Sequence, residues 1–169
     1  CDIKINILIR PRFGDFLYSE VEMEEMEEEI AQFRKLGANG VVIGTLTARG
    51  EIDRVRMGRL MDRAGGMEVT LHRAFDMTRD PFSALDTAVE LGCRTILTSG
   101  QAGSALEGVE LLRQLYQRAA GRIAVMAGGG VKRGNIPALY EKTGITAYHT
   151  TGRKGPVNSG MVYRKTGVS

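Results

Sequence analysis

Three ionisable residues follow a short apolar run in the middle of the sequence. His72 and Arg73 come directly after Val69–Leu71, and Asp76 follows His72 by four positions. Imidazole titrates near neutral pH, so His72 is a candidate general acid or base, with Arg73 as an anion clamp and Asp76 as the orienting carboxylate. The structural alternative is an Arg73–Asp76 ion pair with His72 capping a structural network. Because neighbouring strand residues point to opposite faces, we expect only one of residues 72 and 73, His72, to face a site.

Further candidate ligand-binding residues follow the other apolar runs. Two guanidinium groups, those of Arg10 and Arg12, could hold a carboxylate or a phosphate, or could instead form an ion-pair lattice with Asp15. A glycine run would let backbone N–H groups approach an anion, although it could equally be a plain tight turn. These three glycines, two hydroxyl residues and a second imidazole complete the candidate anion-binding set: Gly128, Gly129, Gly130, Thr98, Ser99 and His149.

Apolar and amphipathic segments alternate along the chain and would position these residues. The predicted strands are Ile3–Arg10, Val41–Thr45, Met67–His72, Arg94–Thr98, Arg122–Ala127 and Ile145–Thr150. A helix is predicted after each of the first five, with caps at Ser19, Asp53, Asp80, Ser104 and Asn135. Residues 154–169 are expected to form a loop. Strict alternation of strands and helices indicates a parallel sheet covered by helices.

Nearly every predicted strand ends in polar residues or glycine. This favours a (βα)8 barrel over an open doubly wound sheet, because in a barrel all strand ends face one mouth. Six strands cannot close a barrel, and open edges would expose apolar strands. We therefore expect an α/β fold, an incomplete TIM-type barrel of six parallel strands and five helices, forming one domain over residues 1–169. It would lack the first two βα units and the last helix, which puts the glycine run after strand seven, a frequent phosphate-binding place.

Composition excludes several classes of partner. The net charge is +3, and no basic run is interleaved with aromatic residues, so we expect no nucleic-acid partner. No apolar run approaches the ~20 residues that a membrane span needs. The two cysteines, Cys1 and Cys93, lie in no metal-binding or redox spacing, which fits a reducing cytoplasm. The methionine pairs have helical spacing and are expected in the core rather than on a copper ion: Met23 with Met26, and Met57 with Met61.

Several segments together resemble the CutC copper-homeostasis family. They are Ile9–Arg12 with Gly14–Phe16, Thr70–Met77, Leu97–Gly100, Ser104–Gly108 and Gly128–Val131. The resemblance implies a cytoplasmic barrel of this type that self-associates as a homo-oligomer and binds copper. The copper ligands proposed in that family are cysteines on the early strands, which have no counterpart here, so the metal ligands are expected outside this chain.

Two functions therefore remain open. The first, implied by the resemblance, is a copper-homeostasis protein that binds copper ions in the cytoplasm. The second is an enzyme acting on a small phosphorylated or carboxylated metabolite at the C-terminal mouth of the barrel. In that case Arg10, Arg12 and the glycine run would hold the small anionic ligand, and His72, oriented by Asp76, would move a proton. A plainer third possibility is a scaffold whose mouth binds a partner.

Overall fold

The computed structural model describes residues 3–151, which form a six-stranded parallel sheet with the strands in chain order. The strands are β1 (Asn6–Leu8), β2 (Gly40–Ile43), β3 (Glu68–Leu71), β4 (Thr95–Thr98), β5 (Ala124–Ala127) and β6 (Ala147–Tyr148). The helices are α1 (Glu20–Lys35), α2 (Arg54–Ala64), α3 (Pro81–Glu90), α4 (Val109–Ala119) and α5 (Ile136–Thr143), with a 3-10 helix, η1 (Arg73–Met77), between β3 and α3. The expected loop after residue 154 lies outside the described residues.

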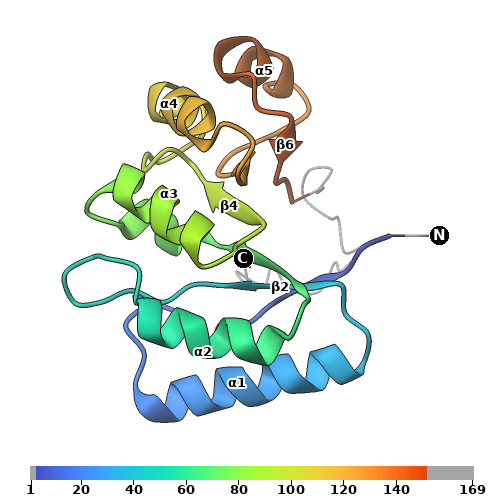
Figure 1. Ribbon diagram of the computed structural model, residues 1–169. Helices are drawn as coiled ribbons and strands as arrows, with labels where there is room; N and C mark the ends of the chain where they lie inside the picture. Colours follow the sequence, from blue (N-terminus) through green and yellow to red (C-terminus); the bar gives the residue numbers. More distant parts are fainter. Residues whose placement is uncertain (1–2, 152–169) are drawn as a thin grey trace, which may run out of the picture.

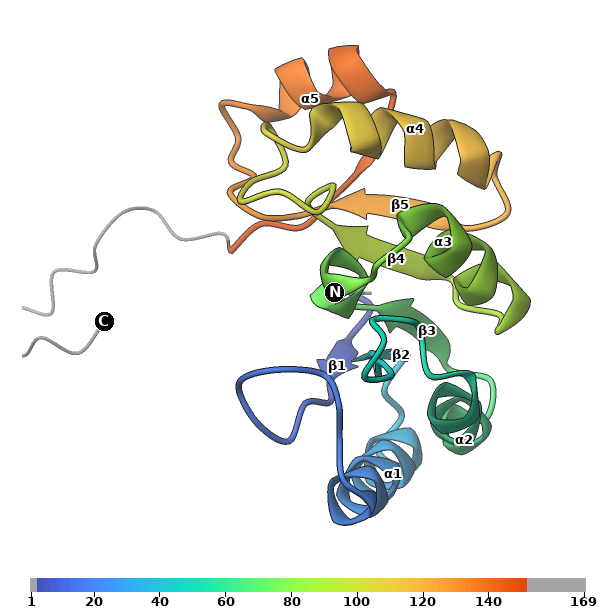
Figure 2. The same cartoon turned by 90° about the vertical axis from the view of Figure 1, so that its left-hand side faces the viewer.

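The sheet curves, and the helices lie along one side of it. Figure 1 shows the helices in an arc that runs from α1 at the bottom, past α3, to α5 at the top, with the strands inside the arc. The view in Figure 2 shows the same order from β1 to β5. The arrangement is a half-barrel of six strands and five α-helices, which confirms the predicted incomplete TIM-type barrel.

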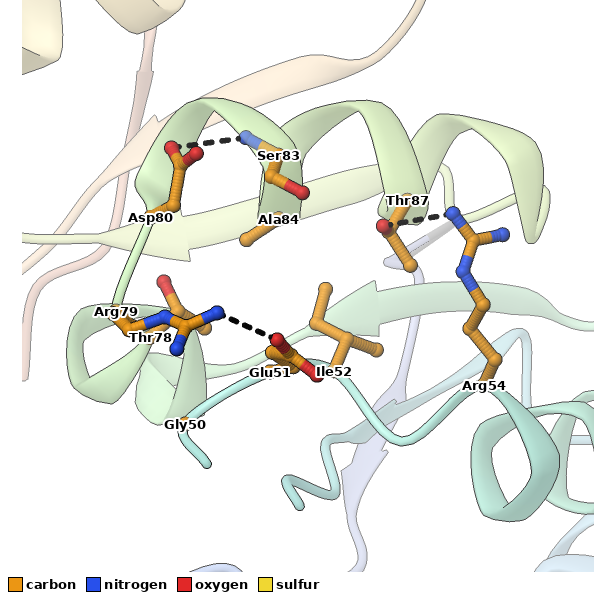
Figure 3. Close-up of a pocket in the computed structure, with 10 residues that line it drawn as sticks. All are labelled: Gly50, Glu51, Ile52, Arg54, Thr78, Arg79, Asp80, Ser83, Ala84 and Thr87. Carbon is orange, nitrogen blue, oxygen red and sulfur yellow. Dashed lines mark hydrogen bonds and ion pairs between the residues drawn. The ribbon is translucent and has the colours of Figure 1, made fainter. Parts of the chain in front are cut away.

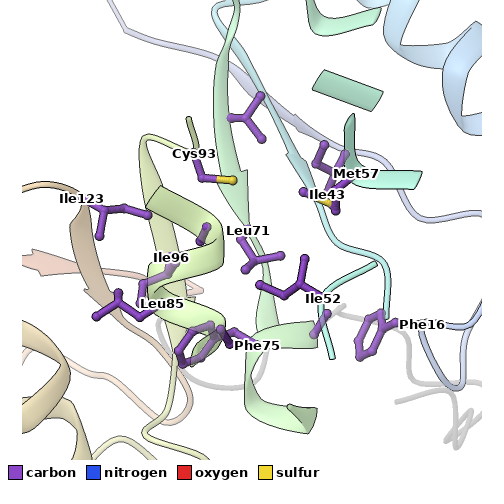
Figure 4. Packing of buried hydrophobic residues seen from close by; sticks show 14 of the residues in the cluster. Phe16, Ile43, Ile52, Met57, Leu71, Phe75, Leu85, Cys93, Ile96 and Ile123 are labelled. Carbon is purple, nitrogen blue, oxygen red and sulfur yellow. The ribbon is translucent and has the colours of Figure 1, made fainter. Parts of the chain in front are cut away.

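Alternate residues of the strands point to opposite faces of the half-barrel, as the strand period requires. The outer face is apolar and packs against the helices, and Figure 4 shows this packing around Leu71. Three methionines of the helices, Met23, Met26 and Met57, are fully buried in the same core, which confirms their predicted packing role. Each buried side chain of this size contributes about 1.5–3 kcal/mol relative to an exposed one. The core therefore fixes the inner face and the strand ends in space.

Local signals at the helix ends are mostly confirmed. Ser19 and Glu22 form the predicted capping box of α1. Asp53 accepts a hydrogen bond from the Arg56 amide at 3.0 Å, and Asp80 caps α3 with Pro81 at its start. These caps satisfy backbone donors that have no partner inside the helix.

One predicted helix start is wrong, and one predicted cap lacks its side-chain hydrogen bond. Helix α4 begins at Val109 rather than after Ser104, because the Ala105 amide donates to the Gly129 carbonyl at 2.9 Å and holds this segment as a turn. Asn135 precedes α5 but makes no side-chain cap. Its side-chain Nδ2 instead donates to the Gly130 backbone carbonyl at 2.9 Å, and its side-chain Oδ1 accepts from the Lys132 backbone amide at 2.8 Å. Both corrections arise from contacts with the glycine run.

Candidate functional site

A sharp turn at the end of β3 determines where His72 and Arg73 point. Strand β3 ends at Leu71, and His72 caps the 3-10 helix η1 by accepting a hydrogen bond from the Ala74 amide on its Nδ1 at 3.2 Å. Both His72 and Arg73 line one cavity on the inner face. The expectation that only one of them would face a site is therefore wrong, because neither residue continues the alternation of the strand.

The Asp76 carboxylate binds the loop after β4 rather than the imidazole. It accepts hydrogen bonds from Arg73 Nε at 2.6 Å, Thr98 Oγ1 at 2.5 Å, the Ser99 amide at 3.1 Å and the Gln101 amide at 3.3 Å. Its side chain is only 7% exposed. The predicted orientation of His72 by Asp76 is thus wrong. The structure shows the alternative, an Arg73–Asp76 pair with His72 as a cap.

Thr98 and Ser99 support this network and are fully buried. The Thr98 hydroxyl also accepts a hydrogen bond from the Gly100 amide at 2.9 Å. The Ser99 hydroxyl accepts from Arg73 Nη2 at 2.9 Å and lies 2.6 Å from the Ala102 carbonyl. We predicted both hydroxyls as ligand donors at the mouth, whereas the structure uses them to hold Arg73 and Asp76.

Arg12 and Asp15 organise the loop between β1 and α1. Arg12 donates from Nη2 to Asp15 at 2.9 Å and from Nε to Glu22 at 2.5 Å. The Arg12 hydrogen bond is the main cause that lowers the pKa of Asp15, whereas the pKa of Glu22 is lowered first by the hydrogen bond from the Ser19 amide and then by Arg12. The predicted clamp of Arg10 with Arg12 is therefore absent from the described residues, and the alternative ion pair of Arg12 with Asp15 is present. Arg10 remains directed to the inner face.

The outer cavity lies between the loops after β5 and β6 and has a volume of about 850 Å³. Among the described residues, three cationic side chains and no carboxylate line it; these lining residues are Arg73, Gly129, Gly130, Val131, Lys132, Arg133, Gly134, Ile136, His149, Thr150 and Thr151. Among residues 3–151, neither Lys132 nor Arg133 forms an ion pair. The outer cavity is therefore electropositive.

The glycine run brings its backbone close to Arg73. Gly129 and Gly130 have φ values of +92° and +67°, which side chains rarely adopt. A Cβ on Gly129 would lie 3.1 Å from Ser99 Cβ and 3.6 Å from Arg73 Nη1. Gly128 instead continues the strand pairing, since its amide donates to the Thr98 carbonyl at 2.9 Å. Within the described part of the chain, the amides of Gly129 and Gly130 donate no hydrogen bond, which leaves them available to an anion.

The inner cavity, of about 440 Å³, adjoins the outer cavity and shares Arg73 and His149 with it. The other residues that line it are Asn6, Leu8, Arg10, Phe16, Val42, Thr70, His72, Leu97 and Met126. The Arg10 guanidinium lies 4.7 Å from the centre of the Phe16 ring, which in turn lies 4.9 Å from the imidazole centre of His72. Burial, followed by the nearby Arg10 charge, lowers the pKa of His72 from 6.5 to about 4. The imidazole is therefore neutral at physiological pH.

Gly44 provides the space that the imidazole occupies. A Cβ at this position would lie 2.7 Å from His72 Cε1 and Nδ1 and 2.9 Å from Leu71 Cδ1. Gly44 follows β2, so the position of His72 depends on the neighbouring strand as well as on its own. The contact of Gly44 with His72 could not be predicted, because nothing local in the sequence links the two residues.

The structure thus brings together half of the predicted site residues. Arg10, His72, Arg73, Gly129, Gly130 and His149 line the two connected cavities, and Arg12, Asp15, Asp76, Thr98, Ser99 and Gly128 support the surrounding loops. Sequence reasoning missed Phe16, Lys132 and Arg133. The last two could have been found as a pair of cations directly after the glycine run.

A third cavity, of about 280 Å³, lies away from the mouth between the loop before α2 and helix α3, as Figure 3 shows. Its two arginines are paired with carboxylates, Arg79 with Glu51 at 2.7 Å and Arg54 with Glu90 at 2.6 Å. Both of its arginines are thus already paired, and we place the candidate site at the mouth instead.

A copper site does not fit the residues that the structure describes. Within residues 3–151, no three His, Cys, Asp or Glu side chains gather as a metal site would require. Cys93 is buried near the start of β4, away from the mouth, and burial raises the pKa of its thiol to about 11. Copper(I) prefers thiolate and thioether ligands, and the buried methionines are part of the core. Cys1 lies outside the described residues.

Within residues 3–151, no helix is both long and apolar enough to cross a membrane.

Comparison with known proteins assigns the chain to a family. The model of the CutC family matches residues 1–154. The chain belongs to the CutC family. A CutC family protein of Bacteroides thetaiotaomicron is 48% identical to this chain over 166 residues, which cover 98% of this chain and 66% of that protein. The corresponding protein of Chromobacterium violaceum is 47% identical over 167 residues, with 99% and 67% covered. The chain thus spans about two thirds of the length of these CutC relatives.

Solved structures agree with this family assignment. A CutC protein from Streptococcus agalactiae, which is named for copper homeostasis, matches with a TM-score of 0.84 and 32% identity, covering 87% of this chain and 72% of that chain. An aldolase, QR15, matches with a TM-score of 0.68 and 19% identity, covering 88% and 68%. The second similarity shows the fold alone. The family resemblance and the TIM-type fold predicted from the sequence are both confirmed.

Proposed function

We propose that this chain binds a small phosphorylated or carboxylated metabolite at the mouth of the half-barrel and forms the active site of an enzyme acting on it. The observation that carries the proposal is the outer cavity, which Arg73, Lys132 and Arg133 line without any lining carboxylate among residues 3–151; of the three, Arg73 alone is paired with a carboxylate there, that of Asp76. Two glycine amides without hydrogen-bond partners in residues 3–151 adjoin the same space. Cationic side chains combined with backbone N–H groups are a common means of holding phosphate.

The surrounding network prepares Arg73 for this role. Its Nε and Nη2 donate to Asp76 and Ser99, which fixes the plane of the guanidinium. Its Nη1 makes no hydrogen bond among the described residues and lies beside Gly129. In the proposal Arg73 contacts the anion, Asp76 acts as a positioning residue, and His72 and Arg10 face the rest of the ligand in the inner cavity.

Binding of inorganic phosphate, measured by isothermal titration calorimetry, tests this proposal. Replacing both Lys132 and Arg133 with Ala should weaken binding about two- to thirtyfold, because each exposed charge pair is worth roughly 0.2–1 kcal/mol. Lys142→Ala, which removes an exposed cation of the last turn of α5, is the matched control and should change little. Equal affinities for the double variant and the control would contradict the proposal.

A second candidate function, a role in copper homeostasis, is supported by family membership and by the name of the S. agalactiae relative. Because the described residues do not suit copper(I), we propose that the whole protein, a cytoplasmic homo-oligomer, binds copper through ligands outside residues 3–151. Competition for copper(I) with a chromophoric chelator tests this. Cys93→Ser should leave the affinity of the chain for copper unchanged, and a tenfold loss would place a copper ligand at Cys93.

A further inference from the structure

Four buried polar side-chain atoms have no hydrogen-bond partner within residues 3–151. They are Arg10 Nε, Tyr18 Oη, Thr45 Oγ1 and His72 Nε2. All four follow β1, β2 or β3 at the mouth end of the sheet. Buried polar groups in folded proteins are almost always hydrogen-bonded, so each such atom calls for an explanation. Two of these residues, Arg10 and His72, line the inner cavity, which indicates a place where a polar group of a ligand is received.

His72 is the best defined of these groups. It is 5% exposed, its ring packs on Phe16, and it lines the inner cavity. Its Nδ1 accepts the Ala74 amide hydrogen, so the proton of the neutral imidazole resides on Nε2. Because the pKa of His72 is lowered to about 4, this neutral form persists across the physiological range. His72 Nε2 is therefore a buried donor without an acceptor in the described chain.

The inner cavity limits what can supply that acceptor. Its walls are largely aliphatic, with Leu8, Val42, Leu97 and Met126 contributing from four strands. Like His72 Nε2, the nearby Arg10 Nε can only donate a hydrogen bond. The group that enters must accept hydrogen bonds without needing to donate one, and a carbonyl oxygen on a short carbon skeleton meets this requirement.

The two cavities adjoin, so one ligand can occupy both. Arg73 and His149 line each of them, which places the electropositive outer cavity next to the donor-bearing inner one. We propose that the ligand is a phosphorylated carbonyl compound, with its phosphate in the outer cavity and its carbonyl oxygen accepting a hydrogen bond from His72 Nε2. Because Nε2 is buried and the imidazole packs on Phe16, the side chains around Nε2 have to shift for this contact. This inference rests on the proposed function and assigns His72 as a hydrogen-bond donor rather than as a base.

Three probes on the unaltered 169-residue chain test the assignment: dihydroxyacetone phosphate, glycerol phosphate and inorganic phosphate. The first two differ in a carbonyl against a hydroxyl group. We expect dihydroxyacetone phosphate to bind about tenfold more tightly than glycerol phosphate, the size expected when a buried donor gains its acceptor. His72→Leu should abolish this preference, whereas His72→Gln, which keeps an N–H donor, should retain part of it.

Nitrogen NMR of the His72 ring provides a readout that does not depend on the variants folding. The Nε2–H signal should shift with dihydroxyacetone phosphate and remain in place with inorganic phosphate. Equal affinities for the two organic probes, with phosphate still bound, would overturn the inference and leave the proposed function intact. An unmoved Nε2–H signal in the bound state would overturn it as well. Failure of all three probes to bind would overturn both.

Discussion

Replacing Asp76 with Asn should lower the free energy of unfolding by about 3 kcal/mol. The carboxylate is 7% exposed and accepts hydrogen bonds from Arg73, Thr98, Ser99 and Gln101. Asparagine keeps the shape but converts one oxygen into an NH₂ group that faces N–H donors. A hydrogen bond to a charged group is worth roughly 1.5–3 kcal/mol, and a buried donor left unpaired costs roughly 1–3 kcal/mol. The lower part of this range applies, because Arg73 is 45% exposed and water can replace part of the hydrogen bonding that it loses with the carboxylate.

Urea unfolding followed by circular dichroism gives the measurement, by linear extrapolation to water. The matched control is Asp86→Asn on α3, whose carboxylate pairs with Arg118 at 2.6 Å and Arg122 at 3.1 Å but is 32% exposed. That substitution should cost at most about 1 kcal/mol, as exposed ion pairs usually do. If the two variants lose equal stability, the buried network around Asp76 does not organise the mouth in the way argued above.

Three further predictions follow from burial and backbone geometry. The pKa of His72 is about 4 in the folded chain, below the ordinary 6.5, so the unfolded state takes up a proton at a higher pH than the folded state does. The free energy of unfolding should therefore fall by up to about 3 kcal/mol as the pH drops from 6.5 to about 4. His72→Gln should flatten this part of the stability profile, and parallel profiles for the two proteins would contradict the assignment. The Cys93 thiol, with its pKa raised to about 11, should resist alkylation in the native protein and react after denaturation, as mass spectrometry would show; rapid native labelling would contradict its burial. Gly129→Ala should lose about 1–2 kcal/mol of stability and bind phosphate more weakly, because a Cβ there is strained and approaches Arg73, whereas Gly134→Ala, with open space around it, should do neither. Equal effects of the two glycine substitutions on calorimetric phosphate binding would rule out this account.

Features determined by nearby residues could be predicted from the sequence. The capping box of Ser19 and Glu22, the Asp80–Pro81 start of α3 and the left-handed glycine that ends α5 all depend on contacts within a few residues. The regular alternation of strands and helices likewise led to the half-barrel. The strands proved shorter than predicted, since β1 covers only Asn6–Leu8 of the apolar stretch that begins at Ile3. Apolar residues beside a strand resemble those within it, so composition does not mark where pairing ends.

The partners of the charged residues could not be predicted in the same way. From the sequence, Arg12 could bind either a ligand or the nearby Asp15. The path of the loop, which also brings Arg12 to Glu22, decides in favour of the ion pair. Asp76 could likewise accept a hydrogen bond from His72 or from the loop after β4. It binds the loop, which provides more hydrogen-bond donors. The short helix η1, which turns His72 and Arg73 into one cavity, has no periodic signal because it spans only 5 residues. These outcomes depend on contacts between neighbouring βα units.

The space left by Gly44 constrains how this mouth can evolve. The backbone of Gly44 is not left-handed, so alanine is excluded there only by the imidazole and Leu71 at 2.7–2.9 Å. The two positions can therefore change in one order only: the imidazole must first be replaced by a smaller group, and the end of the Leu71 side chain must shift, before any side chain is accepted at residue 44. A lineage that has filled position 44 would find it difficult to regain histidine at position 72.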